Sequence, residues 1–240
     1  MDASELYDPE FRKLIKSKKP TIIIPVGSLE QHGAHLPITT DSDIVTEVAS
    51  RLAKKCGFIS FPTISYGVSF EHDPLFNVSM DDLKWRNYLF NVIDSIEKTV
   101  CLNPDLISNN KSIIILNGHH GNVEPLNKIL EEQYRTDIKP RAYSYWNFMK
   151  HEFDHAGFVE TSLMLAISDK VKMKKAKKGL ITKDLSEKEM QRINKLSTQP
   201  GGFTQVAKNG VWGDPTGATK KDGEKFLAEI VRNLAKECQS

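Results

Sequence analysis

Two short apolar runs do most to limit the folds open to this 240-residue chain. Residues 21–26 read TIIIPV and residues 112–116 read SIIIL. Neither run has a polar face, which is typical of strands that are covered on both sides. A polar loop follows each run, and apolar residues at helical spacing follow each loop, over 44–53 and 126–130. This alternation predicts an α/β fold with a mostly parallel sheet and helices on both of its faces.

Further elements fit the same alternation. Short β-branched or aromatic runs predict strands at residues 58–61 and 141–145. Capping residues predict helices that begin near Asp8, at a capping box from Ser79 and near Thr219. A further helix with an apolar face is expected over residues 158–167.

The segment from residue 170 to residue 199 departs from this alternation. Six of the nine residues in 170–178 are lysine, and the remainder is polar with weak periodicity, so we expect a surface excursion. The whole chain carries 33 Lys and Arg against 31 Asp and Glu, a net charge of +2. With no aromatic residues among the lysines, the run is more typical of a solvated loop than of a nucleic-acid site. We therefore expect no nucleic-acid partner.

The cysteines and the hydropathy pattern indicate a compartment. Cys56, Cys101 and Cys238 lie far apart and form no CxxC pair, which suggests neither a zinc ribbon nor a disulfide framework. No stretch approaches the roughly 18 apolar residues of a membrane span. We expect a cytoplasmic protein without a membrane partner. No internal repeat or firm boundary divides the sequence, so we expect one domain over residues 1–240.

The loop after the first apolar run is rich in residues that bind metals. It spans residues 27–41 and contains Glu30, His32, His35 and Asp41. Oxygen and nitrogen donors this close together, with no thiolate, suit Zn, Mn or Fe in a catalytic site. Asp41 has two carboxylate oxygens with which it could bridge two ions. The alternative interpretation is that Glu30 caps a turn and the histidines face solvent.

The loop after the second apolar run, residues 117–122, reads NGHHGN. Glycines on either side of a histidine pair let the backbone approach an ion or a substrate closely. Because this loop and the first one follow equivalent strand ends, one shared site is the better interpretation. Adjacent side chains usually point apart, so we expect His119 to bind metal and His120 to pack or to contact substrate.

The third feature lies in residues 154–162. His155 follows an acidic residue that could orient its ring, and a loop position suits a proton donor to a leaving amine. Lone loop histidines are also common as plain surface residues. Glu160 falls in the first turn of the expected helix, where the helix dipole stabilises a carboxylate with or without a ligand role.

Three other patterns are absent from the sequence. No GxGxxG opens a strand-to-helix turn, and no GxxxxGK[ST] occurs, so dinucleotide and P-loop phosphate binding have no support. No GxSxG nucleophile elbow occurs either, which removes the commonest pattern of a serine hydrolase.

Together these motifs resemble the creatininase family of metal-dependent amidohydrolases. The resemblance rests on four ordered segments over nearly the whole chain: residues 25–33 running on to Asp41, 117–119, 155–162 and 210–219. It implies a three-layer α/β/α sandwich with a mostly parallel sheet. It also implies a centre of two divalent metal ions per chain (Zn, Mn or Fe), a small-molecule substrate and assembly as a homohexamer.

The resemblance implies a role for each matching residue. Carried over by position, Glu30 and His119 bind one metal ion, His32 binds the other, and Asp41 bridges both. A metal-activated hydroxide would attack the substrate carbonyl, while His155 passes a proton to the departing nitrogen.

The chain departs from creatininase proper at Gly121, where the resemblance leads us to expect an acidic metal ligand. The glycine-rich loop is more similar to family branches that include an archaeal formamidopyrimidine nucleotide deformylase and a peptide-trimming maturase. In those branches another carboxylate must complete the second metal site. We expect Glu160 to be that ligand and also a catalytic residue.

The resemblance extends to the substrate pocket. Trp146 lies in a segment close to the one that lends creatininase a pocket tryptophan, so it could stack on a flat heterocycle or serve as a core aromatic residue. Glu71 and His72 fall in a segment similar to the family's pocket loop. With these two residues we expect His35 and His120 to contact substrate.

We therefore expect a binuclear metal hydrolase that cleaves a non-peptide C–N bond in a small cyclic amide or formamide. One alternative is a formamidopyrimidine ribonucleotide deformylase of flavin or deazaflavin biosynthesis, which would need Lys or Arg near the pocket to bind its phosphate. An alternative of another class is a catalytically silent metal-binding scaffold.

Overall fold

The computed structural model describes residues 1–18, 20–101, 113–131 and 140–239. Its sheet has four strands in the order β2-β1-β3-β4, and every pairing is parallel. The strands are β1 (Ile22–Val26), β2 (Ile59–Ser60), β3 (Ile113–Asn117) and β4 (Arg141–Ser144). The predicted parallel sheet is confirmed, although residue 112 of the expected third strand lies outside the described residues.

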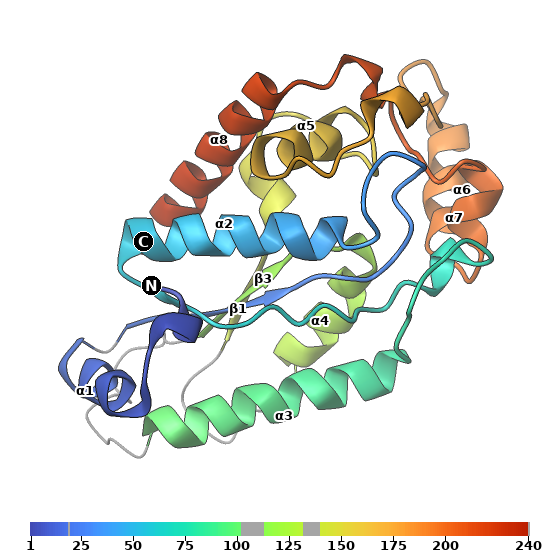
Figure 1. Ribbon diagram of the computed structural model, residues 1–240. Helices are drawn as coiled ribbons and strands as arrows, with labels where there is room; N and C mark the ends of the chain where they lie inside the picture. Colours follow the sequence, from blue (N-terminus) through green and yellow to red (C-terminus); the bar gives the residue numbers. More distant parts are fainter. Residues whose placement is uncertain (19, 102–112, 132–139, 240) are drawn as a thin grey trace.

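Helices cover both faces of the sheet (Figure 1). On one face lie α2 (Thr40–Cys56), α5 (Phe158–Ile167) and α8 (Lys220–Gln239). On the other lie α1 (Asp8–Lys18), α3 (Asp82–Cys101) and α4 (Val123–Glu131). The predicted α/β/α arrangement is confirmed. Among the described helices, none combines the length and the apolar character that crossing a membrane requires.

The two apolar runs bury alternate side chains in opposite layers. Ile23 and Ile114 pack in the core beneath α2, α5 and α8. Ile22, Ile24 and Ile115 pack in the second core, with residues of α3 such as the fully buried Trp85. Successive strand residues point to opposite faces, so a strand that is covered twice needs an apolar residue at every position.

The predicted start of α8 is confirmed, and the predicted cap of α3 is not. Thr219 caps α8, since its hydroxyl accepts a hydrogen bond from the Asp222 amide at 3.1 Å. For α3 the predicted capping box from Ser79 is wrong. Asp81 accepts the Lys84 amide instead, at 3.1 Å, while the Ser79 hydroxyl accepts the Ser69 amide at 2.9 Å. Ser79 therefore holds the loop that contains Ser69 and does not cap the helix.

The expected surface excursion contains helices that its weak periodicity did not predict. α6 (Glu187–Ser197) begins with a capping box between Ser186 and Glu189, and α7 (Gly202–Val206) follows it. Every residue of α6 keeps part of its surface in solvent. The short 3-10 turns of the structure are η1 (Ala3–Glu5), η2 (Phe70–His72), η4 (His120–Asn122), η5 (Tyr145–Phe148), η6 (Met173–Lys175) and η7 (Pro215–Gly217).

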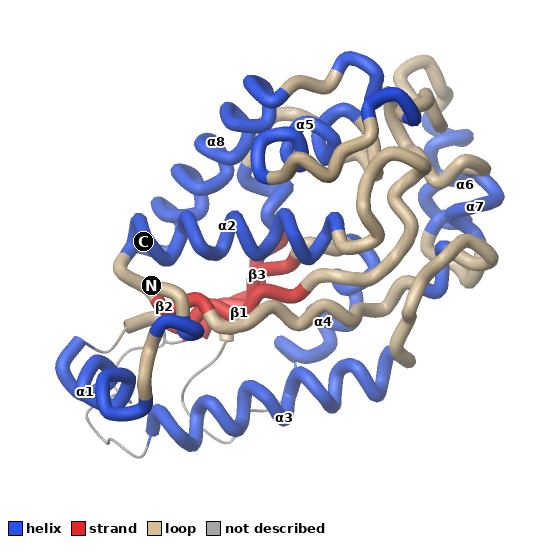
Figure 2. Tube along the Cα trace, viewed as in Figure 1, coloured by secondary structure: helices blue, strands red, loops and turns tan. Residues whose placement is uncertain are grey.

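Neighbouring parallel strands bring their following loops together. β1 and β3 are adjacent, with Val26 opposite Asn117, and the Gly118 amide donates to the Val26 carbonyl at 2.8 Å. Figure 2 shows the long loops gathered beyond this end of the strands. The polar residues after each strand therefore meet at one edge of the sheet, as the alternation of strands and helices in the sequence predicts.

Burial of the central strands gives a stability prediction. Ile114→Val removes one methylene from a fully buried side chain and should lower the free energy of unfolding by about 1 kcal/mol, measured by denaturant titration. The same substitution at Ile38, which is 43 % exposed, is the matched control and should cost less than about 0.5 kcal/mol. Equal losses at the two positions would contradict this account of the core.

Candidate metal centre

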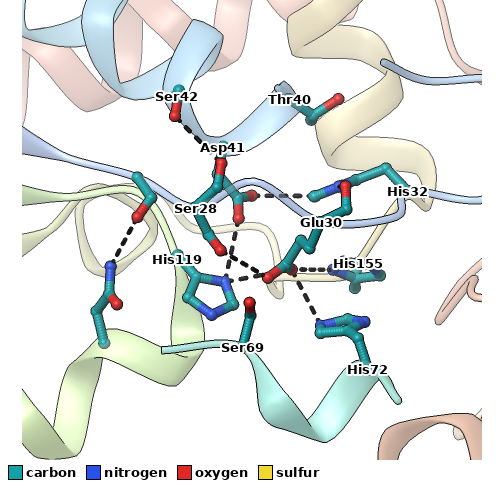
Figure 3. A network of polar contacts seen from close by, with 12 residues as sticks. Ser28, Glu30, His32, Thr40, Asp41, Ser42, Ser69, His72, His119 and His155 are labelled. Atoms are coloured by element: carbon teal, nitrogen blue, oxygen red, sulfur yellow. Dashed lines mark hydrogen bonds and ion pairs between the residues drawn. The ribbon is translucent and has the colours of Figure 1, made fainter. Parts of the chain in front are cut away.

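Five residues from four segments form one buried cluster. Glu30 and His32 come from the loop after β1, Asp41 from the first turn of α2, His119 from the loop after β3, and Glu160 from the first turn of α5. Each of these residues is at most 3 % exposed. The structure thus brings together all five residues that the sequence analysis expects to bind metal (Figure 3 shows four of them).

Asp41 lies between two sets of ligands. Its Oδ1 is 3.0 Å from His32 Nε2, and its Oδ2 is 3.1 Å from His119 Nδ1 (Figure 3). Glu30, Asp41 and His119 place donor atoms within 4.8 Å of one another, and so do His32, Asp41 and Glu160. The two sets share only the Asp41 carboxylate, which is the geometry expected of a bridging ligand.

The donor set fits a pair of divalent cations. Glu160 Oε1 is buried and accepts no hydrogen bond from the described part of the chain. Glu30 Oε1 and Asp41 Oδ2 are also buried and face only imidazole nitrogens, of His72 at 3.0 Å and His119 at 3.1 Å. A buried carboxylate oxygen without a donor is costly unless it binds a cation. The imidazole and carboxylate donors, without a thiolate, match Zn, Mn or Fe.

The pKa shifts in the cluster also favour a bound cation. Burial and the nearby Asp41 raise the pKa of Glu160 to about 8, although His32 opposes the shift. Burial alone would lower the pKa of His32, but Asp41 and Glu160 outweigh it and raise the pKa to about 10. Although burial opposes ionisation of Glu30, the imidazoles of His119 and His72 hold its pKa well below the usual value. Protons on the histidines therefore compensate carboxylate charge that a bound cation would otherwise neutralise.

Surrounding groups orient the ligands. The His119 Nε2–H donates to the Val68 carbonyl at 2.9 Å, which turns Nδ1 toward Asp41. Asn122 accepts the Val68 amide at 3.0 Å and donates to the Gly27 carbonyl at 3.0 Å, so it ties this segment to the loop after β1. Hydrogen bonds of this kind fix the tautomer and direction of a metal-binding histidine.

A strained turn holds Glu160. Ala156 has a φ of 51°, in the left-handed region that residues with a Cβ rarely adopt, and its amide donates to Glu160 Oε2 at 2.6 Å. Asp154 caps α5, since its carboxylate accepts the amides of Val159 at 2.9 Å and Glu160 at 3.3 Å. Backbone strain of this sort persists where the surrounding structure demands it, commonly at functional sites.

His155 and His72 stand beside the cluster. The His155 ring packs against His32 with 4.3 Å between centroids and 34° between ring planes, and its Nδ1 is 4.0 Å from Glu30 Oε1. His72 Nε2 is 3.0 Å from the same oxygen. The Gln31 side-chain amide lies 2.9 Å from His72 Nδ1 and 3.2 Å from His155 Nε2, so one residue that the sequence analysis did not single out positions both rings.

A cavity of about 400 Å³ opens onto the cluster. Its lining includes Glu71, His72, His120 and His155, all expected to contact substrate or to act on it. The remaining described lining residues are Asp41, His119, Phe153, Asp154, Glu160, Asn194, Ser197, Thr198, Phe203 and Trp212. Most of the cavity surface is apolar, which is typical of a small-molecule site.

Two of the expected substrate contacts lie elsewhere. Trp146 stacks on Phe153 with 4.5 Å between ring centroids and stands one layer behind the cavity wall. His35 is 1 % exposed, and its Nε2 shares a hydrogen bond of 2.9 Å with Thr161 Oγ1. Phe153 thus occupies the wall position that the sequence analysis gave to Trp146.

The sequence analysis also missed the outer wall of the cavity. Asn194, Ser197 and Thr198 come from the end of α6, and Phe203 comes from α7. Trp212 lies in the fourth motif segment, but no role was assigned to it. Nothing in the local pattern of these residues signals a pocket, because they reach it only through the path of the chain after α5.

Known proteins resemble this chain over most of its length. A family model described as creatinine amidohydrolase matches residues 4–238. The chain is 32 % identical over 228 residues to a mycofactocin precursor peptide peptidase of Mycobacterium ulcerans, covering 90 % of this chain and 84 % of the relative. It is 27 % identical over 192 residues to a creatinine amidohydrolase of Pseudomonas putida, covering 68 % and 70 %.

Two further matches complete the comparison. A 2-amino-5-formylamino-6-ribosylaminopyrimidin-4(3H)-one 5'-monophosphate deformylase of Methanosphaera stadtmanae is 35 % identical over 160 residues, which cover 63 % of this chain and 62 % of the relative. The crystal structure of a creatinine amidohydrolase superposes with a TM-score of 0.76 at 22 % identity, covering 98 % of this chain and 95 % of that one. Solved creatininase structures include a manganese form and a Zn–Zn type.

The burial of His35 gives a pH prediction. Burial and the nearby His32 lower the pKa of His35 to about 4, from 6.5. Between pH 6.5 and 4 the unfolded chain binds a proton there that the folded chain does not, so the free energy of unfolding should fall as the pH is lowered through this window. His35→Gln should reduce that slope in denaturant titrations at matched metal content. The same substitution at exposed His151 should retain the wild-type slope, and equal slopes in both variants would contradict the assignment.

Proposed function

The chain belongs to the creatininase family of metal-dependent hydrolases that act on C–N bonds, and from this membership we propose that it is a two-metal amidohydrolase cleaving a small cyclic amide or formamide. The observation that carries the proposal is the Asp41 carboxylate, shared by two sets of buried ligands. Glu160 Oε1, a buried carboxylate oxygen that no donor among the described residues contacts, supports it.

We assign the ligands in two groups. Glu30 and His119 would hold the first ion, His32 and Glu160 would hold the second, and Asp41 would be a ligand of both. We favour Zn or Mn, because solved creatininase structures include a manganese form and a Zn–Zn type. Fe prefers the same types of ligand. Divalent cations at such a centre polarise a carbonyl group and make water a nucleophile at neutral pH.

His155 is the proposed proton carrier. Burial and neighbouring histidines hold its pKa well below the usual value, so it is neutral at pH 7 and able to accept a proton. If its Nε2–H donates to the Gln31 carbonyl, 3.2 Å away, Nδ1 is the free base on the side of Glu30. From there the ring can take a proton from water and return it to the leaving nitrogen.

The deformylase alternative lacks the phosphate site that it requires. The described residues that line the cavity include no Lys or Arg, so no ammonium or guanidinium group there can pair with a nucleotide phosphate. Retention of all five expected ligands together with His155 also weighs against a catalytically silent scaffold.

Peptide hydrolysis is the second candidate function. A relative that is 32 % identical over 90 % of this chain is a precursor peptide peptidase. We therefore add peptides to the proposed substrates, because a two-metal centre that attacks an amide carbonyl can hydrolyse a peptide bond by the same chemistry.

The proposal also covers the oligomeric state and the cellular location of the protein. We retain the homohexamer that the family resemblance implies and the cytoplasmic location that the cysteine pattern indicates. Exposed large apolar side chains support an interface between subunits. Ile38, Phe76 and Val78 are 43 %, 51 % and 39 % exposed. They lie near one another, because the carbonyls of Ile38 and Phe76 accept the adjacent amides of Glu30 and Gln31.

Metal content tests the bridging carboxylate. Gently purified protein should contain about two ions per chain by elemental analysis, and Asp41→Asn should lose most of both because each set depends on that carboxylate. Asp43→Asn, the same change two residues along α2, is the matched control and should keep the wild-type content. An Asp41→Asn variant that retains both ions would refute the bridge.

Turnover tests the proton carrier. His155→Ala should lower kcat by about 10²- to 10⁴-fold and leave metal content unchanged, because the ring moves a proton but is not a proposed ligand. The assay measures creatine formed from creatinine, formate released from a simple formamide and amine released from a short peptide, with exposed His151→Ala as the control. Loss of metal together with activity would make His155 a ligand instead. Inactivity of metal-loaded wild type on all three substrates would remove the proposed substrate classes.

A further inference from the structure

A second cavity of about 390 Å³ adjoins the first, and the proposed mechanism does not use it. Glu71, His120, Ser197 and Thr198 line both cavities. The other described lining residues of the second are Val68, Phe70, Asp82, Gly121, Val123, Glu124, Pro125, Asn127 and Lys128. The second cavity therefore extends the catalytic cavity across the beginnings of α3 and α4.

The boundary between the two cavities lies next to the metal ligands. Glu71 Oε1 is 3.5 Å from His119 Nε2. A Cβ at Gly121 would come within 2.7 Å of the same Glu71 oxygen and 2.1 Å of the Val68 carbonyl oxygen, so only glycine fits here. The absent side chain lets the backbone of this loop close against Glu71, and a substrate that reaches the cluster passes beside that carboxylate.

The charge of the second cavity is negative. Glu71, Asp82 and Glu124 contribute three carboxylates against the single ammonium group of Lys128. Lys128 Nζ is already engaged, 2.9 Å from Glu124 Oε1 and 3.5 Å from Asp82 Oδ2. Asp82 Oδ2 also lies 3.3 Å from Arg86 Nε, so Asp82 is paired with two cations. Glu71 and Glu124 keep the lining acidic, which disfavours anions there.

The remaining lining is largely apolar. Val68, Phe70, Val123 and Pro125 supply aliphatic and aromatic surface. Apolar walls with a few hydrogen-bond acceptors suit a chain that carries N–H groups or an ammonium group along an aliphatic stem. They do not suit a phosphate or a second carboxylate.

We propose that this second cavity is a substrate subsite, which binds the part of the substrate beyond the scissile amide, and that this part is a neutral or cationic peptide-like chain. The inference rests on the proposed function, since it takes the first cavity as the place where the amide reaches the metal cluster. It deepens that function by naming the substrate class: an extended amide without an anionic end.

N-formyl peptides test the subsite, because each carries a formamide bond and peptide bonds in one molecule. The probes are formylglycine amide, formyl-Gly-Ala-Lys amide and formyl-Gly-Ala-Glu amide, each given to metal-loaded protein, with formate and free amines measured separately. The lysine probe should show a kcat/KM about fivefold above that of the glutamate probe, through a lower KM. Formylglycine amide should be the poorest substrate.

Glu124→Lys is the variant that reverses the charge of this cavity at an exposed position. It should remove the preference for the lysine probe and leave kcat/KM for formylglycine amide unchanged. Glu131→Lys makes the same change seven residues further along α4, outside the lining, and should behave as wild type. Equal kcat/KM for all three probes, or a Glu124→Lys effect that is the same for short and long probes, would overturn the subsite.

Failure of the proposed function has a different signature. If metal-loaded wild type turns over none of the probes, that function fails for these bonds, and calorimetric binding of formyl-Gly-Ala-Lys amide then tests the subsite alone. Binding that weakens about fivefold in Glu124→Lys supports the subsite without catalysis. Absence of binding to wild type, or equal binding to both proteins, overturns it.

Discussion

The contacts of Asp41 with His32 and His119 determine most of the site. A carboxylate that is 2 % exposed has lost its hydration and needs compensating charge from close by. The first turn of α2 supplies part of that compensation through the helix dipole, and the two imidazoles supply more. Because those histidines follow different strands, the ion pairs also hold the loops after β1 and β3 at a fixed separation.

The ligands were predictable from the sequence because each lies next to a landmark. Glu30 and His32 follow the first apolar run, His119 follows the second, and Glu160 opens a helix with a clear apolar face. In a parallel sheet those landmarks converge without any knowledge of side-chain packing. The fold class follows from the same reasoning, while the single domain over residues 1–240 stays a prediction.

The cavity wall was not predictable in the same way. Phe153 and Trp146 are close in sequence and both aromatic, and only their packing decides that the former faces the cavity. α6 was missed although Met190, Ile193 and Leu196 recur at helical spacing after the Ser186 capping box. These apolar residues are few, and the segment around them is polar. Ser79 fails as a cap because the Ser69 amide, from a different loop, competes for its hydroxyl. Such outcomes depend on contacts between segments rather than on local pattern.

Gly121 has a consequence for how this chain relates to creatininase proper. An acidic residue there would place its Cβ 2.1 Å from the Val68 carbonyl oxygen, so the loop that carries Val68 and Glu71 would have to move before the substitution could be tolerated. A substitution at Gly121 would therefore need a compensating change in the loop that carries Val68 and Glu71, so these two segments are expected to vary together.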